Sequence, residues 1–161
     1  MEIRKLTESD LTELLSLYKH LHVADEPAPS RAEPSRVEPG QARAEAVWRE
    51  LLANPRIRYF GVAIDGQLVS SCNLTVVPNL TRECRPYGLI ENVVTHAEHR
   101  SRGLGKAVLA QALSFAWGQD CYKVMLMTGR KDEATFHFYE SAGFDRYDKQ
   151  AFIVKYPSAP V

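Results

Sequence analysis

The feature that most constrains the fold is a glycine turn between a strand and an apolar helix. Residues 87–95 read YGLIENVVT, a run typical of a strand, and residues 103–117 carry apolar side chains on most sides, as a buried helix does. Gly103 and Gly105 lie where the chain enters this helix. A helix that needs cover on nearly all sides, next to a strand, predicts an α/β fold with helices packed on a sheet.

The rest of the pattern adds further strands and helices to this unit. Apolar residues at helical spacing predict helices over 11–21, 41–53 and 132–142, and Thr7 to Asp10 resembles a capping box before the first of them. Asp65-Gly66 is a strong hairpin signal between two expected strands. The predicted strands cover 1–6, 57–64, 67–77, 87–95 and 122–128, with one or two closing strands in 144–156.

Residues 122–128, YKVMLMT, are almost continuously apolar. A run of this kind is typical of a central parallel strand that is covered on both faces. We therefore expect this strand to lie inside the sheet rather than at its edge.

One segment interrupts the regular pattern. Residues 24–40 contain four prolines and almost no apolar side chains, which predicts a mobile loop. The loop is either a solvated connector or a lid over a substrate. Since the helix before it cannot bury its apolar face alone, we expect one domain over residues 1–161 rather than a domain boundary here.

The charge balance excludes some classes of partner. Lys and Arg together number 20 and so do Asp and Glu, which gives a formal net charge of zero. This gives no support to nucleic acid or to a polybasic membrane contact, although a local basic patch remains compatible with it. The first residues lack the apolar core of a signal peptide, and no run approaches the ~18 apolar residues of a membrane span.

The cysteines predict a reducing environment. Cys72, Cys84 and Cys121 are odd in number and widely spaced, without a CxxC pair or a metal-like cluster. We expect free thiols, a cytoplasmic location and no metal.

The glycine turn also carries the first functional signal. Gly103 and Gly105 leave backbone N–H groups free at the positive end of a helix, and Arg100, Arg102 and Lys106 add positive charge. A pyrophosphate suits such a place. A tight turn without a ligand is the alternative for an isolated G-x-G. The segment does not match the Rossmann or Walker patterns, which argues against nicotinamide dinucleotides and nucleoside triphosphates.

Three motifs in order resemble the GNAT superfamily of N-acetyltransferases. Residues 100–105 form R-x-x-G-x-G, which is similar to the acyl-CoA-binding motif of that family. Residues 89–95, LIENVVT, resemble its fourth strand, and residues 138–144, FYESAGF, resemble its F-Y-E-x-x-G-F signature. Within the family, IENVV and residues 121–124, CYKV, look most similar to glucosamine-phosphate N-acetyltransferases.

The resemblance implies a fold and a co-substrate. The implied fold is α/β (α+β), with a central mixed, mostly antiparallel sheet of six to seven strands and about four helices. The implied co-substrate is acetyl-CoA. The backbone of Val94 to His96 would pair with the pantetheine arm, and the N–H of Val93 or Val94 would polarise the thioester carbonyl. The implied cofactor-binding residues are Val93, Val94, Thr95, His96, Arg100, Ser101, Arg102, Gly103, Leu104, Gly105 and Lys106.

The resemblance also implies a general acid at Tyr139, which would protonate the leaving thiolate. An aromatic residue that only fills the core beside Phe136 and Phe138 is the alternative. Glu91 is the candidate general base, because a carboxylate inside an apolar strand has its pKa raised by desolvation. A carboxylate that faces solvent, or a water chain that acts as the base, remains open.

The motifs predict an N-acetyltransferase that transfers acetyl from acetyl-CoA directly to a primary amine of a small molecule, such as an amino sugar. The alternatives are a protein or peptide N-acetyltransferase and a non-catalytic acyl-CoA sensor. A homodimer is compatible with the resemblance, and we expect neither nucleic acid nor a membrane as partner.

Overall fold

The computed structural model describes residues 1–21 and 40–154. The predicted mobile loop at 24–40 lies outside the described residues except for Gly40. The chain forms two compact units, Met1–Leu126 and Met127–Val161, and each is described by itself. Among the described residues, every helix is too short or too polar to cross a membrane.

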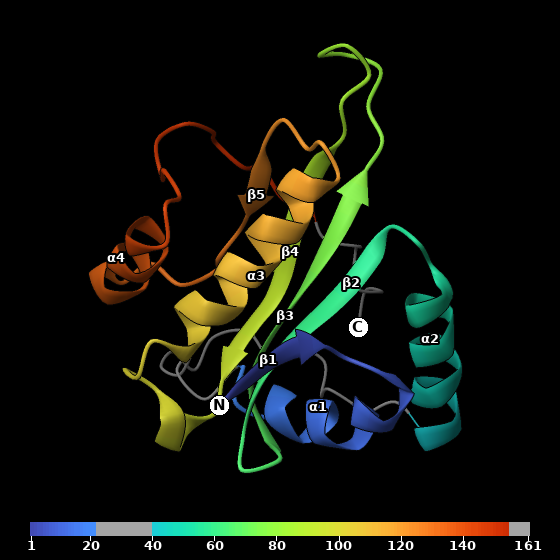
Figure 1. Ribbon diagram of the computed structural model, residues 1–161. Helices are drawn as coiled ribbons and strands as arrows, with labels where there is room; N and C mark the ends of the chain where they lie inside the picture. Colours follow the sequence, from blue (N-terminus) through green and yellow to red (C-terminus); the bar gives the residue numbers. More distant parts are fainter. Residues whose placement is uncertain (22–39, 155–161) are drawn as a thin grey trace, which may run out of the picture. The chain divides into compact units, whose positions relative to one another are not determined.

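A five-stranded sheet organises the first unit (Figure 1). The strands lie in chain order, each antiparallel to the next except the last pair, which is parallel. The mixed, mostly antiparallel sheet is therefore confirmed. Its strands are β1 (Glu2–Lys5), β2 (Ile57–Ile64), β3 (Gln67–Val77), β4 (Tyr87–Thr95) and β5 (Val124–Leu126).

The expected four α-helices are present in the described residues. The first unit holds α1 (Leu11–Tyr18), α2 (Gln41–Ala53) and α3 (Leu104–Gly118), with short 3-10 turns η1 (Glu8–Asp10) and η2 (Ala97–His99). The second unit holds α4 (Glu133–Ser141). The hairpin turn is confirmed at Asp65 and Gly66, which both have positive φ angles, as a type I′ turn requires.

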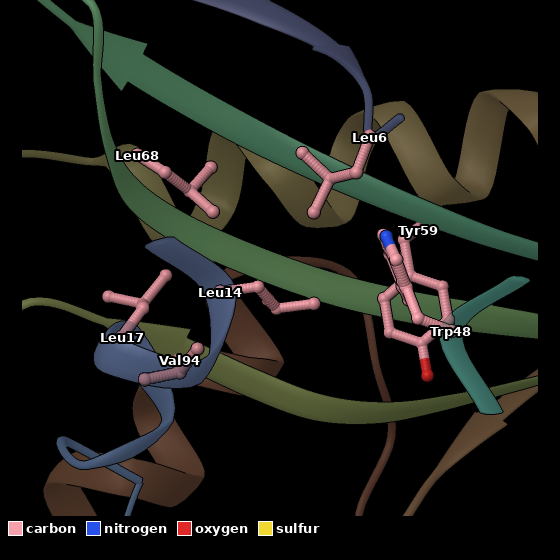
Figure 2. Packing of buried hydrophobic residues seen from close by; sticks show 7 residues of the cluster. All are labelled: Leu6, Leu14, Leu17, Trp48, Tyr59, Leu68 and Val94. Carbon is pink, nitrogen blue, oxygen red and sulfur yellow. The ribbon is translucent and has the colours of Figure 1, made fainter. Parts of the chain in front are cut away.

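The helices of the first unit cover both faces of its sheet. Helix α3 lies on one face, where the Cys72 Sγ contacts the Val108 carbonyl at 3.7 Å and the rings of Phe60 and Phe115 lie 5.7 Å apart. Helices α1 and α2 lie on the other face. Figure 2 shows the buried cluster that joins them to the sheet, made of Leu6, Leu14, Leu17, Trp48, Tyr59, Leu68 and Val94.

The prediction of six to seven strands is wrong for the described residues, because 144–154 form no strand. Here the Asp145 carboxylate accepts a hydrogen bond from the Tyr147 N–H, and Arg146 pairs with Glu133 and Glu140 of α4. These contacts tie residues 145 and 146 to a local turn and to α4. Residues 155 and 156 of the predicted strand lie outside the described part.

The position predicted for the strand in 122–128 is also wrong. Strand β5 has three residues and lies at the edge of the sheet among the described strands. It pairs with β4 over Gly88, Leu89 and Ile90, and its side chains are half-buried. The apolar run correctly predicted that this strand pairs in parallel with its neighbour. Its side chains are less buried than the run predicted.

A charged contact fixes the start of α1 against the sheet. The Arg4 guanidinium of β1 donates two hydrogen bonds, of 2.6 and 2.8 Å, to the buried Asp10 carboxylate. The same carboxylate accepts from the Thr7 N–H at 2.7 Å, as the predicted capping box requires. The hydrogen bonds from Arg4, followed by those from Thr7, lower the pKa of Asp10 to about 2 despite its burial.

We predict that Asp10→Asn destabilises the fold by about 1–2 kcal/mol at pH 7, after allowance for solvent screening at the partly exposed Arg4. Because the pKa of Asp10 is lowered in the folded state, its contribution is present above about pH 4 and is lost as the pH falls toward 2. Urea unfolding of both proteins between pH 7 and pH 2 measures the difference.

Glu8→Gln is the control, since within the described residues the Glu8 side chain forms only an exposed pair with Arg49, with side chains 72% and 59% exposed. Its effect is expected to stay within about 0.5 kcal/mol. An Asp10→Asn protein as stable as wild type at pH 7 would show that Arg4 and Thr7 do not stabilise the fold through this carboxylate.

Candidate functional site

Strand β4 carries a β-bulge in the middle of the IENVV motif. Ser71 of β3 lies opposite Val94 and Asn73 lies opposite Glu91, so Asn92 and Val93 together oppose Cys72 alone. Asn92 has a φ angle of 53°, in the left-handed region that asparagine tolerates better than most residues. Its side chain donates a hydrogen bond of 3.1 Å to the Asn73 side-chain oxygen, which holds the bulge to β3.

The bulge determines which side chains share a face. Residues 91 and 94 of a regular strand point to opposite faces, because side chains alternate with a period of two. The extra residue brings Glu91 and Val94 to the same face. Since Val94 packs in the cluster under α1, Glu91 lies on the face that α1 and α2 cover.

Glu91 completes a row of side chains that crosses three strands. Tyr59 of β2 lies opposite Asn73, and Asn73 lies opposite Glu91. Directly opposed residues share a face, and neighbouring strands lie about 4.8 Å apart. Glu91 is half-buried, and this burial raises the pKa of its carboxyl above the ordinary value. A raised pKa suits a general base that accepts a proton near neutral pH.

A cavity of about 590 Å³ begins at the other end of this row. Tyr59 and Tyr18 contribute to its wall, and Arg43 is the charged residue among those that line it. Burial is the main cause that raises the pKa of Tyr18, and Tyr59 and Asn92 lie close enough to affect it. The hydroxyl of Tyr18 has no hydrogen-bond partner within the described residues. The other lining residues are Leu11, Leu14, Leu15, Gly40, Ala44, Val47, Trp48 and Leu51.

The opposite edge of β4 is open along part of its length. Strand β4 continues to Thr95, but β5 pairs with it only as far as Ile90. Within the described part of the chain, residues 91–95 therefore have β3 on one side and no paired strand on the other. An unpaired strand edge presents N–H and C=O groups that can pair with an extended ligand. Of the predicted pantetheine contacts Val94 to His96, Val94 and Thr95 belong to this stretch, and so does Val93, which is predicted with Val94 to polarise the thioester carbonyl.

The predicted anion site follows η2. Ser101 and Gly103 both have left-handed backbones, with φ angles of 59° and 77°, and Gly103 caps the N-terminus of α3. Ala107 donates to the Gly103 carbonyl at 3.0 Å. The preceding N–H groups at 104–106 belong to the first turn, which has no partners inside the helix. Leu104 and Gly105 are buried, whereas Lys106 is exposed.

The basic side chains near this turn have different surroundings. Arg100 donates to the carbonyls of Thr95 and His20, at 3.3 and 3.1 Å, and so links the end of β4 to the chain that follows α1. Arg102 contacts the His99 ring nitrogen at 3.0 Å. The backbone nitrogen of His96 donates to the Val69 carbonyl of β3 at 2.8 Å, which leaves it unavailable to a ligand.

The second unit contains the predicted general acid. Tyr139 is half-buried on α4, with its ring 4.9 Å from Phe138 and 6.3 Å from Phe144. Helix α4 begins after Asp132, whose side chain accepts from the Thr135 N–H at 2.9 Å as an N-cap. Glu91 belongs to the first unit and Tyr139 to the second, and the roles of both remain predictions.

Sequence reasoning missed the polar residues around Glu91. Tyr18, Tyr59, Asn73 and Asn92 fall inside the helix and strands predicted over 11–21, 57–64, 67–77 and 87–95. Asparagines inside apolar strands are unfavourable for sheet pairing, and this signal could have marked Asn73 and Asn92. Within the described residues, no group of three or more His, Cys, Asp or Glu side chains is placed to hold a metal ion, and all three cysteines are free.

Comparison with known proteins identifies the family. Residues 14–144 match the model of the acetyltransferase (GNAT) family. The chain is 33% identical over 150 residues to a glucosamine 6-phosphate N-acetyltransferase of Trypanosoma brucei brucei, and the match covers 93% of this chain and 92% of that protein. The IENVV motif and the R-x-x-G-x-G motif both lie inside the matched family region.

The solved structures agree with this similarity. A proposed acetyltransferase from Agrobacterium tumefaciens has 40% identity and a TM-score of 0.84, with 97% of this chain and 100% of that chain covered. The glucosamine-6-phosphate N-acetyltransferase of Arabidopsis thaliana shares the fold, with a TM-score of 0.75, 22% identity, and 96% and 97% of the two chains covered. The chain therefore belongs to the GNAT family and is an N-acetyltransferase.

Proposed function

We propose that this enzyme transfers the acetyl group of acetyl-CoA to the primary amine of a small molecule, with an amino-sugar phosphate as the first candidate acceptor. The observation that carries the proposal is the similarity, over nearly the whole chain, to a glucosamine 6-phosphate N-acetyltransferase. The cavity of about 590 Å³ supports a small acceptor, since pockets for small molecules have volumes of about 300–1,000 Å³.

The residues of the first unit fit acetyl-CoA. The open edge of β4 would pair with the amide groups of the pantetheine arm. The N–H groups at the start of α3 would bind the pyrophosphate, where, among the residues that the structure describes, no neighbouring heavy atom lies within 4 Å of a Cβ added to the left-handed Gly103. This open space is what a ligand that approaches the backbone closely needs.

Each candidate residue then has a chemical role. When bound, acetyl-CoA supplies the thioester carbonyl that the amine attacks. Glu91 accepts the proton that the ammonium group must lose, and a backbone N–H at Val93 or Val94 polarises the carbonyl oxygen. Tyr139 gives its proton to the thiolate as the carbon–sulfur bond breaks. The amine reacts directly, without a covalent intermediate on the protein.

The two alternatives differ in testable ways. A protein or peptide acetyltransferase would acetylate short peptides better than any small amine. A non-catalytic sensor would bind acetyl-CoA and release no thiol. The predicted cytoplasmic location, the single domain and a homodimer belong to the same proposal, and they require separate measurements.

We predict that Glu91→Gln lowers kcat by about 10²- to 10⁴-fold with the best acceptor. Because burial raises the pKa of Glu91, wild-type kcat/KM should fall on the acid side at a pH above the ordinary glutamate range, and this limb should disappear in the variant. Thiol release is measured with amino sugars and their phosphates, polyamines, amino acids, aminoglycosides and peptides.

The variant is expected to be at least as stable as wild type at pH 7, because it removes a carboxylate whose ionised form burial disfavours. Glu50→Gln on the exposed surface of α2 is the matched control and should keep full activity. Full activity of Glu91→Gln would instead assign proton removal to water or to another group.

We predict that Gly103→Ala weakens CoA binding about tenfold, because an L-residue at a φ angle of 77° strains the backbone that presents the N–H groups of α3. Gly66→Ala is a matched control, since Gly66 has a φ angle of 83° in the distant hairpin and equally open surroundings. Both variants should lose about 1–2 kcal/mol of stability. Calorimetry with CoA should separate them, and equal affinities would remove the pyrophosphate from this turn.

We predict that Tyr139→Phe lowers kcat by about a hundredfold or more and leaves the melting temperature nearly unchanged. The phenylalanine ring preserves the contacts with Phe138 and Phe144 and removes only the hydroxyl. Stopped-flow measurement of thiol release at several pH values tests this role. Unchanged kcat would mean that Tyr139 is a packing residue of α4.

A further inference from the structure

The cavity of about 590 Å³ is lined by carbon-rich stripes of α1 and α2. Each stripe repeats at a spacing of three or four residues and extends over about two helical turns, roughly 10 Å. Tyr59 of β2 adds to the wall from the sheet. A ligand that enters the cavity therefore meets mostly apolar side chains. They are Leu11, Leu14, Leu15, Ala44, Val47, Trp48 and Leu51.

The polar atoms of this wall are few, and one of them is already bound. The Trp48 Nε1–H donates to the carbonyls of Thr7 and Glu8, at 3.2 and 3.3 Å. The same ring packs edge to face with Tyr59 (Figure 2), so it offers carbon atoms rather than its N–H to a ligand.

Arg43 and the Tyr18 hydroxyl are different. Within the part of the chain that the structure describes, the first has no ion-pair partner and the second has no hydrogen-bond partner. Arg43 is also the charged residue among the described residues that line the cavity, so it provides a place for an anionic group.

This lining suits carbon better than a sugar ring. Every hydroxyl of a sugar that leaves water without gaining a partner weakens binding, because its hydrogen bonds to water are lost. Burial of apolar surface in the same place is favourable. The cavity therefore selects a ligand with an apolar body and an acidic group.

The other end of such a ligand has a polar route to Glu91. Tyr18 lies beside Tyr59 and Asn92. The Asn92 side chain donates to that of Asn73 at 3.1 Å. The row from Tyr59 through Asn73 to Glu91 covers two strand spacings, roughly 10 Å. An amine on a short stem therefore reaches the Glu91 carboxylate while the apolar body stays between the helices.

The sequence that joins α1 to α2 supplies few side chains that match this lining. Residues 22–39 lie outside the described part of the chain. Apart from prolines, their only aliphatic side chains larger than alanine are Val23 and Val37. The apolar stripes of the two helices therefore favour an occupant from outside this segment.

We propose that the cavity binds the apolar body of an amphipathic amine, with an acidic group of the ligand at Arg43 and the amine directed along the polar row toward Glu91. The inference rests on the proposed function in taking this ligand as the acetyl acceptor. It narrows the acceptor to amines with an apolar chain or ring, which would set this chain apart from relatives named for glucosamine 6-phosphate.

The test is calorimetry with CoA present, which needs no turnover. The probes are 10-aminodecanoate, decylamine, which lacks the acid, and glucosamine 6-phosphate. Arg43→Gln removes the charge in the cavity, and Arg49→Gln on the same helix is its control. Leu15→Gln places an amide in the apolar wall at a side chain 37% exposed, and Leu80→Gln makes the same change at a side chain 91% exposed outside the cavity.

We expect wild type to bind 10-aminodecanoate more tightly than decylamine, and both more tightly than the sugar. Arg43→Gln should lose about threefold to tenfold of the preference for the acid, whereas Arg49→Gln keeps it. Leu15→Gln should weaken both aliphatic probes about tenfold, whereas Leu80→Gln does not. A wild type that binds neither aliphatic probe overturns the proposal, and so do affinities that Leu15→Gln and Arg43→Gln leave unchanged.

Thiol release with the same three amines separates this inference from the proposed function. Turnover of the sugar without binding of the aliphatic probes would keep the acetyl transfer and overturn the cavity ligand. Binding of 10-aminodecanoate without turnover of any amine would keep the cavity ligand and contradict the acetyl transfer. A dimer that Leu15→Gln dissociates in sedimentation would assign the cavity wall to an interface between copies and also overturn the proposal. If Leu15→Gln does not fold, Val47→Gln replaces it.

Discussion

The bulge at Asn92 is the constraint on which the rest of the candidate site depends. A single extra residue in β4 places Glu91 and Val94 on the same face of the sheet, but the two side chains are buried to different extents there. Val94 is buried under α1 and helps to hold that helix, whereas Glu91 stays half-buried at the end of the polar row. A β4 without the bulge would turn one of them toward α3. Since a one-residue change of register moves every later side chain to the other face, the bulge links the packing of α1 to the position of the proposed base, Glu91.

The bulge lies where β4 loses its partner on the other edge. Pairing with β5 ends at Ile90, and the bulge begins two residues later. The strand is therefore paired on both sides up to Ile90 and, within the described residues, paired on one side beyond it, where the proposed ligand would need its backbone. The chain continues from this open stretch into η2 and the left-handed residues Ser101 and Gly103. The open strand edge, the proposed base Glu91 and the proposed anion turn thus lie close together along one stretch of chain, from β4 to the start of α3.

The sequence predicted local features well because their causes are local. The spacing of apolar residues gave α2 and strands β2, β3 and β4 at their observed bounds, and Asp65-Gly66 gave the hairpin. Thr7 and Asp10 gave the capping box, but not the contact of Asp10 with Arg4, which depends on how β1 lies against α1. The bulge, the row from Tyr59 to Glu91 and the cavity lined by α1 and α2 also depend on register or packing. The predicted closing strand was wrong: residues 144–154 form no strand, and Arg146 pairs with Glu133 and Glu140 of α4, a contact that sequence spacing does not predict.

The net charge of zero gave no indication of an anionic ligand, because it averages over the chain. Locally, residues 96–106 contain two arginines and a lysine against one glutamate, together with two histidines. Arg100 donates from Nε and Nη2 to backbone carbonyls, Arg102 contacts the His99 ring, and Lys106 is exposed. Acetyl-CoA is an anion with several charges spread along its length. A ligand of this kind could contact both the backbone turn and the separate side-chain donors. The arrangement of charge along β4, η2 and α3, rather than its total, is therefore the feature that supports the proposed anionic co-substrate.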